Sequence, residues 1–200
     1  MSSAGPAELV RACSDIRGLY GAAACSIARV TPEGDALRFV ASDGAGATEI
    51  VGVRMGLGRG IAGFVALSGQ PLAVGDVTRD ARFARDVAES TDYVPAALLA
   101  VPLVDEAGDV TGVLSVLDPV RDDGASHLAG RSGTAAELAV LSVLGARLSV
   151  VLTATEREVG LATLAGDDEL LAAIATLAAH RDRDAVRATI VGLARIVEEG

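Results

Sequence analysis

Residues 97–119, ALLAVPLVDEAGDVTGVLSVLDP, decide the fold class of this chain. Two apolar, β-rich runs at 97–104 and 110–117 flank a polar turn, DEAGD, at 105–109. Such runs, joined by a short turn that contains glycine, predict an antiparallel β-hairpin. Because both runs are almost continuously apolar, we expect both faces of this hairpin to be buried.

Further elements are predicted on the N-terminal side of this hairpin. A second hairpin is expected from the runs at 24–30 and 36–42, because the turn sequence TPEGD separates them. Apolar residues recur at helical spacing in 6–19 and in 61–68, and Gly69 supplies a helix stop after the second range. Short strands are expected at 49–56 and 72–77, and a polar loop with a short helix at 76–95.

The C-terminal third of the chain has a helical pattern. One long helix is predicted over 132–161, and two amphipathic segments, about 168–180 and 184–198, predict a helical hairpin. The order of elements predicts an α+β fold, in which helices pack on one side of an antiparallel sheet and the opposite face is open. We therefore expect a domain with flanking helices at 1–160 and a helical appendage at 161–200.

Composition excludes several classes of partner. The net charge is −10, and all 17 basic residues are arginine, so nucleic acid and anionic membranes would meet a repelling field. The most apolar long window, 135–153, contains Glu137 and Arg147 and predicts a core or dimer helix instead of a membrane span. With two cysteines and no signal-peptide pattern, the sequence favours a reducing, cytoplasmic location.

Several motifs occur in a characteristic order. The stretch GRGIAGFVALSGQPLAVGDVTRDARFARD at 58–86 contains a Gly-x-Gly-Ile-x-Gly motif, a strand ending in Asp-Val and an Asp-Ala-Arg-Phe box. A Leu-x-Val-Pro-Leu strand and a Gly-Val-Leu strand follow within 97–119. Over about residues 20–160, this ordered set strongly resembles the GAF family. The resemblance implies a profilin-like sheet of five or six antiparallel strands, with a cavity between one sheet face and the irregular segments.

The three glycines of the first motif have a physical explanation. Gly58, Gly60 and Gly63 permit positive φ angles and a close approach of helix to strand. This role is structural whether or not a ligand binds, so the glycines alone do not indicate a binding site.

Chemistry known from the family is largely missing here. The signature associated with cyclic-nucleotide binding needs Asn and Lys, and this chain contains neither. Covalent bilin attachment and the family's methionine sulfoxide reductases need suitably placed thiols, but only Cys13 and Cys25 are present. His127 and His180 lie in a polar loop and in the appendage, so neither favours haem ligation. We therefore expect no catalytic residue, metal or cofactor, and no enzyme activity.

A non-covalent pocket remains, and the resemblance implies that it lies against the sheet under the loop at 76–95. Three of the five aromatic residues fall around it, and charged residues are available to orient a ligand. Each residue alone is better explained by a structural role. The candidate ligand-binding residues are Phe64, Phe83 and Tyr93 as walls, with Asp76, Arg82, Arg85 and Asp92 as orienting charges.

The resemblance supports two functional hypotheses. The first is a regulatory or sensory module that binds a small molecule or a protein partner, signals through a helix-mediated homodimer and acts on a separate output protein. The alternative is a ligand-free structural or dimerisation scaffold with the same fold. The long helix is apolar nearly all round, so its outer side needs cover from a second copy or from the C-terminal hairpin of the same chain.

Overall fold

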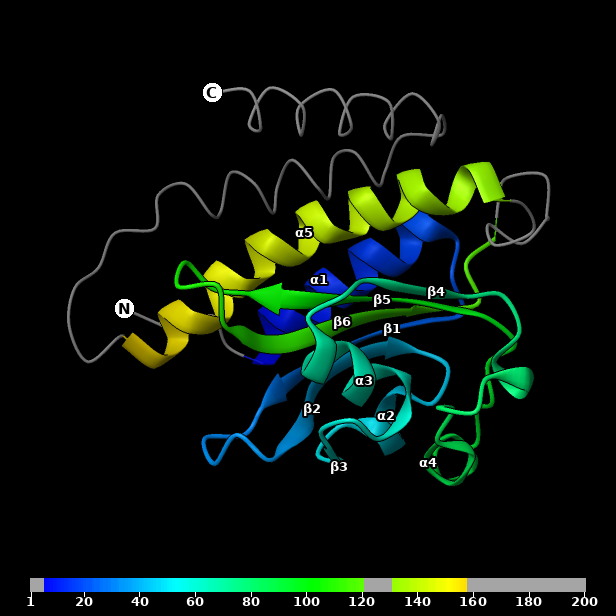
Figure 1. Cartoon of the computed structure of the whole chain (residues 1–200), viewed down its shortest axis with the longest axis horizontal. Helices are drawn as coiled ribbons and strands as arrows, with labels where there is room; N and C mark the ends of the chain where they lie inside the picture. The colour runs from blue at the N-terminus through cyan, green and yellow to red at the C-terminus, as the bar shows by residue number, and fades with distance from the viewer. Residues whose placement is uncertain (1–5, 121–130, 158–200) are drawn as a thin grey trace.

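The computed structural model describes residues 6–120 and 131–157. At its centre is a six-stranded sheet in the order β3-β2-β1-β6-β5-β4, with every neighbouring pair antiparallel (Figure 1). The two expected hairpins are confirmed, and they meet side by side where β1 pairs with β6. The strands are β1 (Ala24–Val30), β2 (Ala36–Gly44), β3 (Arg54–Gly56), β4 (Leu72–Val74), β5 (Leu98–Val104) and β6 (Val110–Leu117).

The two long helices lie on one face of this sheet. Helix α1 (Pro6–Tyr20) and helix α5 (Arg131–Arg157) run across it, as the blue and yellow ribbons of Figure 1 show. Their buried side chains, among them Ile16 and Leu141, pack with sheet residues such as Leu99 in one apolar cluster. The sequence predicted this arrangement, because the leucine stripe of the long helix needs an apolar partner.

Both cysteines are buried on this helix-covered face. Cys13 lies on α1 and Cys25 on β1, and both thiols are free. Burial, with a hydrogen bond to Cys13, raises the pKa of Cys25 well above its ordinary value. A thiol held in its protonated form is a poor nucleophile, so the pair contributes to packing.

The opposite face carries short elements. They are helix α2 (Ala47–Ile50), helix α3 (Gly60–Ser68), the 3-10 turn η1 (Val77–Arg79) and helix α4 (Arg85–Ser90). A second apolar cluster, which includes Leu37, Val65 and Val113, fills part of the space beneath them. This face was expected to be open, but these short elements cover it and leave a cavity.

Two short strands differ from their predicted bounds. The range 49–56 divides into the last part of α2 and β3, because Gly46 starts a helical turn with a φ of 66°. The strand at 72–77 ends early, since the Asp76 carboxylate accepts a hydrogen bond from the Thr78 amide and begins η1. In both cases a local turn ends the extended conformation that the apolar pattern favours.

The glycine motif has the predicted roles. Gly58 and Gly60 adopt φ angles of 80° and 67°. A Cβ atom at Gly63 would lie 2.7 Å from the carbonyl oxygen of Gly56, so α3 can approach the preceding chain only with glycine there.

Some sequence predictions fall outside the described residues. These are the last residues of the helix predicted over 132–161, the helical hairpin at 168–198 and the appendage at 161–200. Within 6–120 and 131–157, no helix combines the length and apolar character that a membrane span requires.

Candidate functional site

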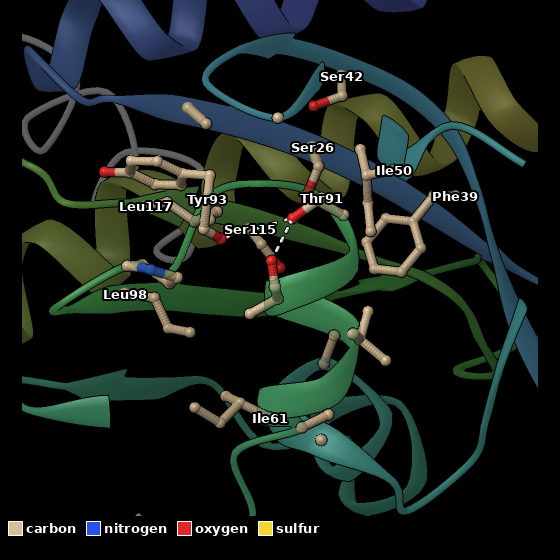
Figure 2. Close-up of a pocket in the computed structure, with 18 of the residues that line it drawn as sticks. Ser26, Phe39, Ser42, Ile50, Ile61, Thr91, Tyr93, Leu98, Ser115 and Leu117 are labelled. Atoms are coloured by element: carbon tan, nitrogen blue, oxygen red, sulfur yellow. Dashed lines mark hydrogen bonds between the residues drawn. The ribbon is translucent and has the colours of Figure 1, made fainter. Parts of the chain in front are cut away.

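Three serines form a row across the centre of the sheet. Ser26 on β1 lies opposite Ser42 on β2 and opposite Ser115 on β6. Directly opposite residues of antiparallel strands share one face of the sheet. The neighbours Cys25 and Ile27 belong to the apolar cluster beneath α1 and α5, so the serine row lies on the other face, as Figure 2 shows from the pocket side.

A cavity of about 120 Å³ lies above this row. Residues of the sheet form its floor, and residues of α2, α3, α4 and the segment 91–95 form its walls and roof (Figure 2). None of the described residues that line it carries a charged side chain. The large apolar side chains of the lining are Phe39, Ile50, Met55, Ile61, Phe83, Val87, Leu98 and Leu117.

The pocket hydroxyl groups differ in how they are bonded. Ser42 donates to the carbonyl oxygen of Cys25 at 3.0 Å, and Thr91 donates to that of Ala88 at 2.8 Å. Ser26 and Ser115 are also buried, yet neither makes a hydrogen bond within the described residues. Both residues border the cavity, so their hydroxyls are accessible from it and can hydrogen-bond to a bound polar atom. A ligand that covered them without such an atom would leave them buried and unpaired, which is unfavourable.

The segment that roofs the pocket is attached to the end of β6 through Asp118. One carboxylate oxygen of Asp118 accepts hydrogen bonds from the amides of Ala96 and Ala97, at 2.9 and 2.8 Å. Its other oxygen accepts a hydrogen bond from the Tyr93 hydroxyl. Burial, together with this hydrogen bond, raises the pKa of Tyr93 above its usual range. The neutral phenol therefore fastens one end of the roof.

A second attachment holds α4. Arg59, just before α3, forms an ion pair with Asp86 in the first turn of α4. The hydrogen bond from Arg59 lowers the pKa of the Asp86 carboxyl. Both side chains are more than half exposed, and α4 has no buried residue. These polar contacts hold the ends of the roof, while Val87 packs on the apolar cluster beneath α4.

The fold agrees with that of a known protein family. The protein-family model described as "GAF domain" matches residues 6–153. The chain belongs to the GAF domain family. GAF domains are typically regulatory or sensory ligand-binding modules, and the six-stranded sheet with its helices agrees with solved GAF structures.

Solved structures of low sequence identity share this GAF fold. The GAF domain of a phosphoenolpyruvate-protein phosphotransferase from Coxiella burnetii has a TM-score of 0.63 and 16% identity, with coverage of 78% of this chain and 86% of its own. The equivalent Acinetobacter domain has a TM-score of 0.59 and 20% identity, covering 76% and 83%. Free methionine-R-sulfoxide reductase from Neisseria meningitidis, in complex with its substrate, has a TM-score of 0.57 and 22% identity, covering 76% and 80%.

One curated relative has a higher sequence identity over a short region. This chain is 40% identical over 76 residues to the dual 3',5'-cyclic-AMP and -GMP phosphodiesterase 11 of Drosophila melanogaster. The match spans 38% of this chain and 5% of the fly protein. The likeness is therefore confined to part of this chain and to a small share of the fly protein.

Two of the seven predicted site residues line the GAF pocket. They are Phe83, just before α4, and Tyr93, in the roof segment 91–95. Phe64 lies on α3 and packs against the guanidinium of Arg82, 4.5 Å from its ring centroid. Arg85 and Asp92 are exposed at the two ends of α4, outside the described pocket lining.

The predicted orienting charges are used locally. Arg82 makes two hydrogen bonds to the carboxylate of Asp80, at 2.9 and 2.6 Å, and these lower the pKa of that carboxyl. Asp76 caps η1 through Thr78, and the side-chain hydrogen bond lowers its pKa. These charges bond to their own loop, and the described lining of the pocket is left without a charged side chain.

Sequence reasoning missed the serine row. Each of the three strands contributes one serine, which gives no signal of its own. The row exists only because β1 lies between β2 and β6, and the pairing of β1 with β6 joins residues about 90 positions apart in the sequence. A hydroxyl on a strand predicted to be buried on both faces was the one available clue.

Proposed function

We propose that this GAF domain is a regulatory module that binds a small molecule between its sheet and the roof formed by α4 and residues 91–95. The observation that carries the proposal is a cavity with apolar walls, bordered by the hydroxyls of Ser26 and Ser115, which have no hydrogen-bond partner among the described residues. Such a cavity can bury apolar ligand surface and orient one polar group.

The same strands give a physical route from the pocket to the helices. Ser26 faces the cavity, while its neighbours Cys25 and Ile27 pack in the cluster that includes α1 and α5. On β6, Ser115 stands likewise between Leu114 and Val116. Because packed interiors resist deformation, a shift of these strands on binding would be passed to the helices.

We further propose that the helices carry the output, through a homodimer or a separate output protein in the cytoplasm. Helix α5 covers the sheet with one side and exposes small apolar residues, such as Ala139 and Ala146, on the other. Two-fold pairing through this side would cover them. A ligand that favours one packing of α5 would then change the interface.

The proposal does not include phosphodiesterase or other catalytic activity. The described pocket lining has no charged side chain, and the hydroxyl of Tyr93, the phenol among these residues, donates its hydrogen bond to Asp118. A cyclic nucleotide would bring a phosphate charge into this neutral cavity, without a cation to pair with it. The pocket therefore supports regulation better than turnover.

Thermal unfolding in the presence of a metabolite panel, together with native mass spectrometry of the purified protein, tests the proposal. A ligand at about 100 times its Kd stabilises the folded state by about 2.7 kcal/mol and raises Tm. Ala88→Phe should abolish the shift, since Ala88 lines the cavity and a phenyl group would fill it. Ala81→Phe, at an exposed position of the same loop, is the control. The absence of any shift and of any retained molecule would favour the ligand-free scaffold.

A further inference from the structure

The dimensions of the pocket restrict the size of its ligand. The cavity measures about 120 Å³, and an engineered apolar cavity of about 150 Å³ in another protein takes up benzene. The space under the roof therefore suits a molecule about as large as one six-membered ring. This step, like those below, rests on the proposed function of the pocket.

The charges around the pocket restrict the charge of the ligand. The described lining carries none. Around it, Arg59 pairs with Asp86 and Arg82 with Asp80. Arg85 and Asp92 are exposed to solvent outside this lining. An ionic ligand would lose its hydration without gaining a counter-ion, and desolvation of an unpaired charge is very unfavourable. The pocket therefore favours a neutral molecule.

The serine row restricts the polar group. Ser26 and Ser115 are directly opposite each other, so their hydroxyls reach the same part of the cavity floor, as Figure 2 shows. Each hydroxyl can donate one hydrogen bond and accept others. Ser42 and Thr91 also line the pocket, but their hydroxyls already donate to the carbonyl oxygens of Cys25 and Ala88. The other large side chains of the wall near the two serines, including Phe39, Ile50 and Leu117, are apolar.

We propose that the ligand is a neutral, ring-sized molecule whose single hydroxyl or carbonyl oxygen binds to Ser26 and Ser115. The two serines select for the oxygen atom, because a ligand without it leaves both hydroxyls buried and unpaired. The apolar walls select the ring. Ser26 and Ser115 are thus specificity-determining residues of this GAF domain.

The test uses probes of matched shape and different polarity. Benzyl alcohol, ethylbenzene and benzylammonium have equal numbers of non-hydrogen atoms, and benzoate adds an anionic member. Their dissociation constants are measured by ligand-observed NMR titration of the full chain. Benzyl alcohol should bind most tightly, and both ions should bind at least about tenfold more weakly than it does.

Serine variants then locate the selectivity. The variants Ser26→Ala and Ser115→Ala, alone and combined, should weaken binding of benzyl alcohol by about twofold to tenfold for each hydrogen bond lost. Binding of ethylbenzene should stay the same or improve. Ser68→Ala, at an exposed position of α3 outside the pocket lining, is the control and should leave both affinities unchanged. Ser26→Cys and Ser115→Cys, which nearly preserve side-chain shape, replace the alanine variants if these fail to fold.

The outcomes separate this inference from the proposed function. Equal binding of ethylbenzene and benzyl alcohol, unchanged in the serine variants, would overturn the role of the serines and leave a ligand-binding pocket. Tighter binding of benzoate or benzylammonium would overturn neutrality. If neither these probes nor the metabolite panel binds, both this inference and the proposed function fail.

Discussion

The two faces of the central sheet differ in what packs against them. On one face, Cys25, Leu99 and Leu114 are fully buried against the long helices α1 and α5. On the other, residues one position away, such as Ser26, Leu98 and Ser115, border a cavity under short helices. One face is thus filled by the long helices, whereas the other combines an apolar cluster with the cavity of the proposed function.

The sharpest test of this comparison uses two adjacent leucines of β5. Leu99→Ala should lower the free energy of unfolding by about 2–5 kcal/mol, because it creates a cavity in the helix-covered cluster. Leu98 borders the existing cavity, so the loss of its side chain removes fewer packing contacts. Leu98→Ala should therefore lower the free energy of unfolding by less, about 1–2 kcal/mol. Urea denaturation of both variants measures the difference, and equal losses would contradict the division between faces.

The helix-covered face also carries the proposed dimer interface, on the outer side of α5. Ala146 is exposed there, and in the proposed homodimer Ala146→Glu would bury two like charges near the two-fold axis. An unpaired buried charge costs about 3–5 kcal/mol, so light scattering at low micromolar concentration should show a monomer. Ala146→Gln, similar in size but neutral, is the control and should remain dimeric. A monomeric wild type would refute the dimer.

Removal of the Tyr93–Asp118 hydrogen bond tests how far the roof of the pocket is held by polar contacts at its ends. Tyr93→Phe removes this bond and should cost about 1 kcal/mol in unfolding free energy. Amide exchange should become faster in the roof at 85–95, while Leu98–Val104 keeps its protection. Equal protection of both segments in the unliganded wild type would contradict a loosely held roof.

The same tyrosine predicts a pH dependence. Its pKa is raised in the folded state, so above about pH 10, the ordinary tyrosine pKa, the unfolded chain ionises first. This contribution to stability is fully present below that pH and is lost as pH rises. The stability of Tyr93→Phe should fall less steeply than that of the wild type over this alkaline range, as measured by denaturant titration.

The smallest effect is expected at the Arg59–Asp86 ion pair. Both side chains are largely exposed, and solvent screens such pairs. Arg59→Ala should therefore leave the unfolding midpoint nearly unchanged, with Asp86→Ala giving the same result. A large shift in either variant would show that the α3–α4 contact stabilises the pocket face more than its exposure implies.

The sequence predicted the fold well because its main signals are local. Strands β1 and β6 have the predicted bounds, since their apolar runs end in polar turns or glycine. Helix α3 ends at Gly69, whose φ of 66° suits a C-cap. The strand predicted at 49–56 was less accurate, because Gly46 and Gly52, both at positive φ, interrupt it with turns.

The site was less predictable because its key contacts are not local. The charges of Asp76 and Arg82 looked available in the sequence, but each bonds to a residue two positions away. The hydroxyls of Ser26 and Ser115 looked unremarkable until the sheet placed them together. Aromatic residues were a better guide, since Phe83 and Tyr93 do line the cavity.

The central pairing of β1 with β6 has a consequence for how the protein folds. The segments Ala24–Val30 and Val110–Leu117 are brought together only after most of the described chain has been synthesised. Closing such a long loop is slow compared with forming either hairpin alone. Until it closes, Ser26 and Ser115 belong to separate halves. A nascent chain that stops before Val110 therefore exposes one side of β1 as an unpaired edge, which favours chaperone binding or aggregation.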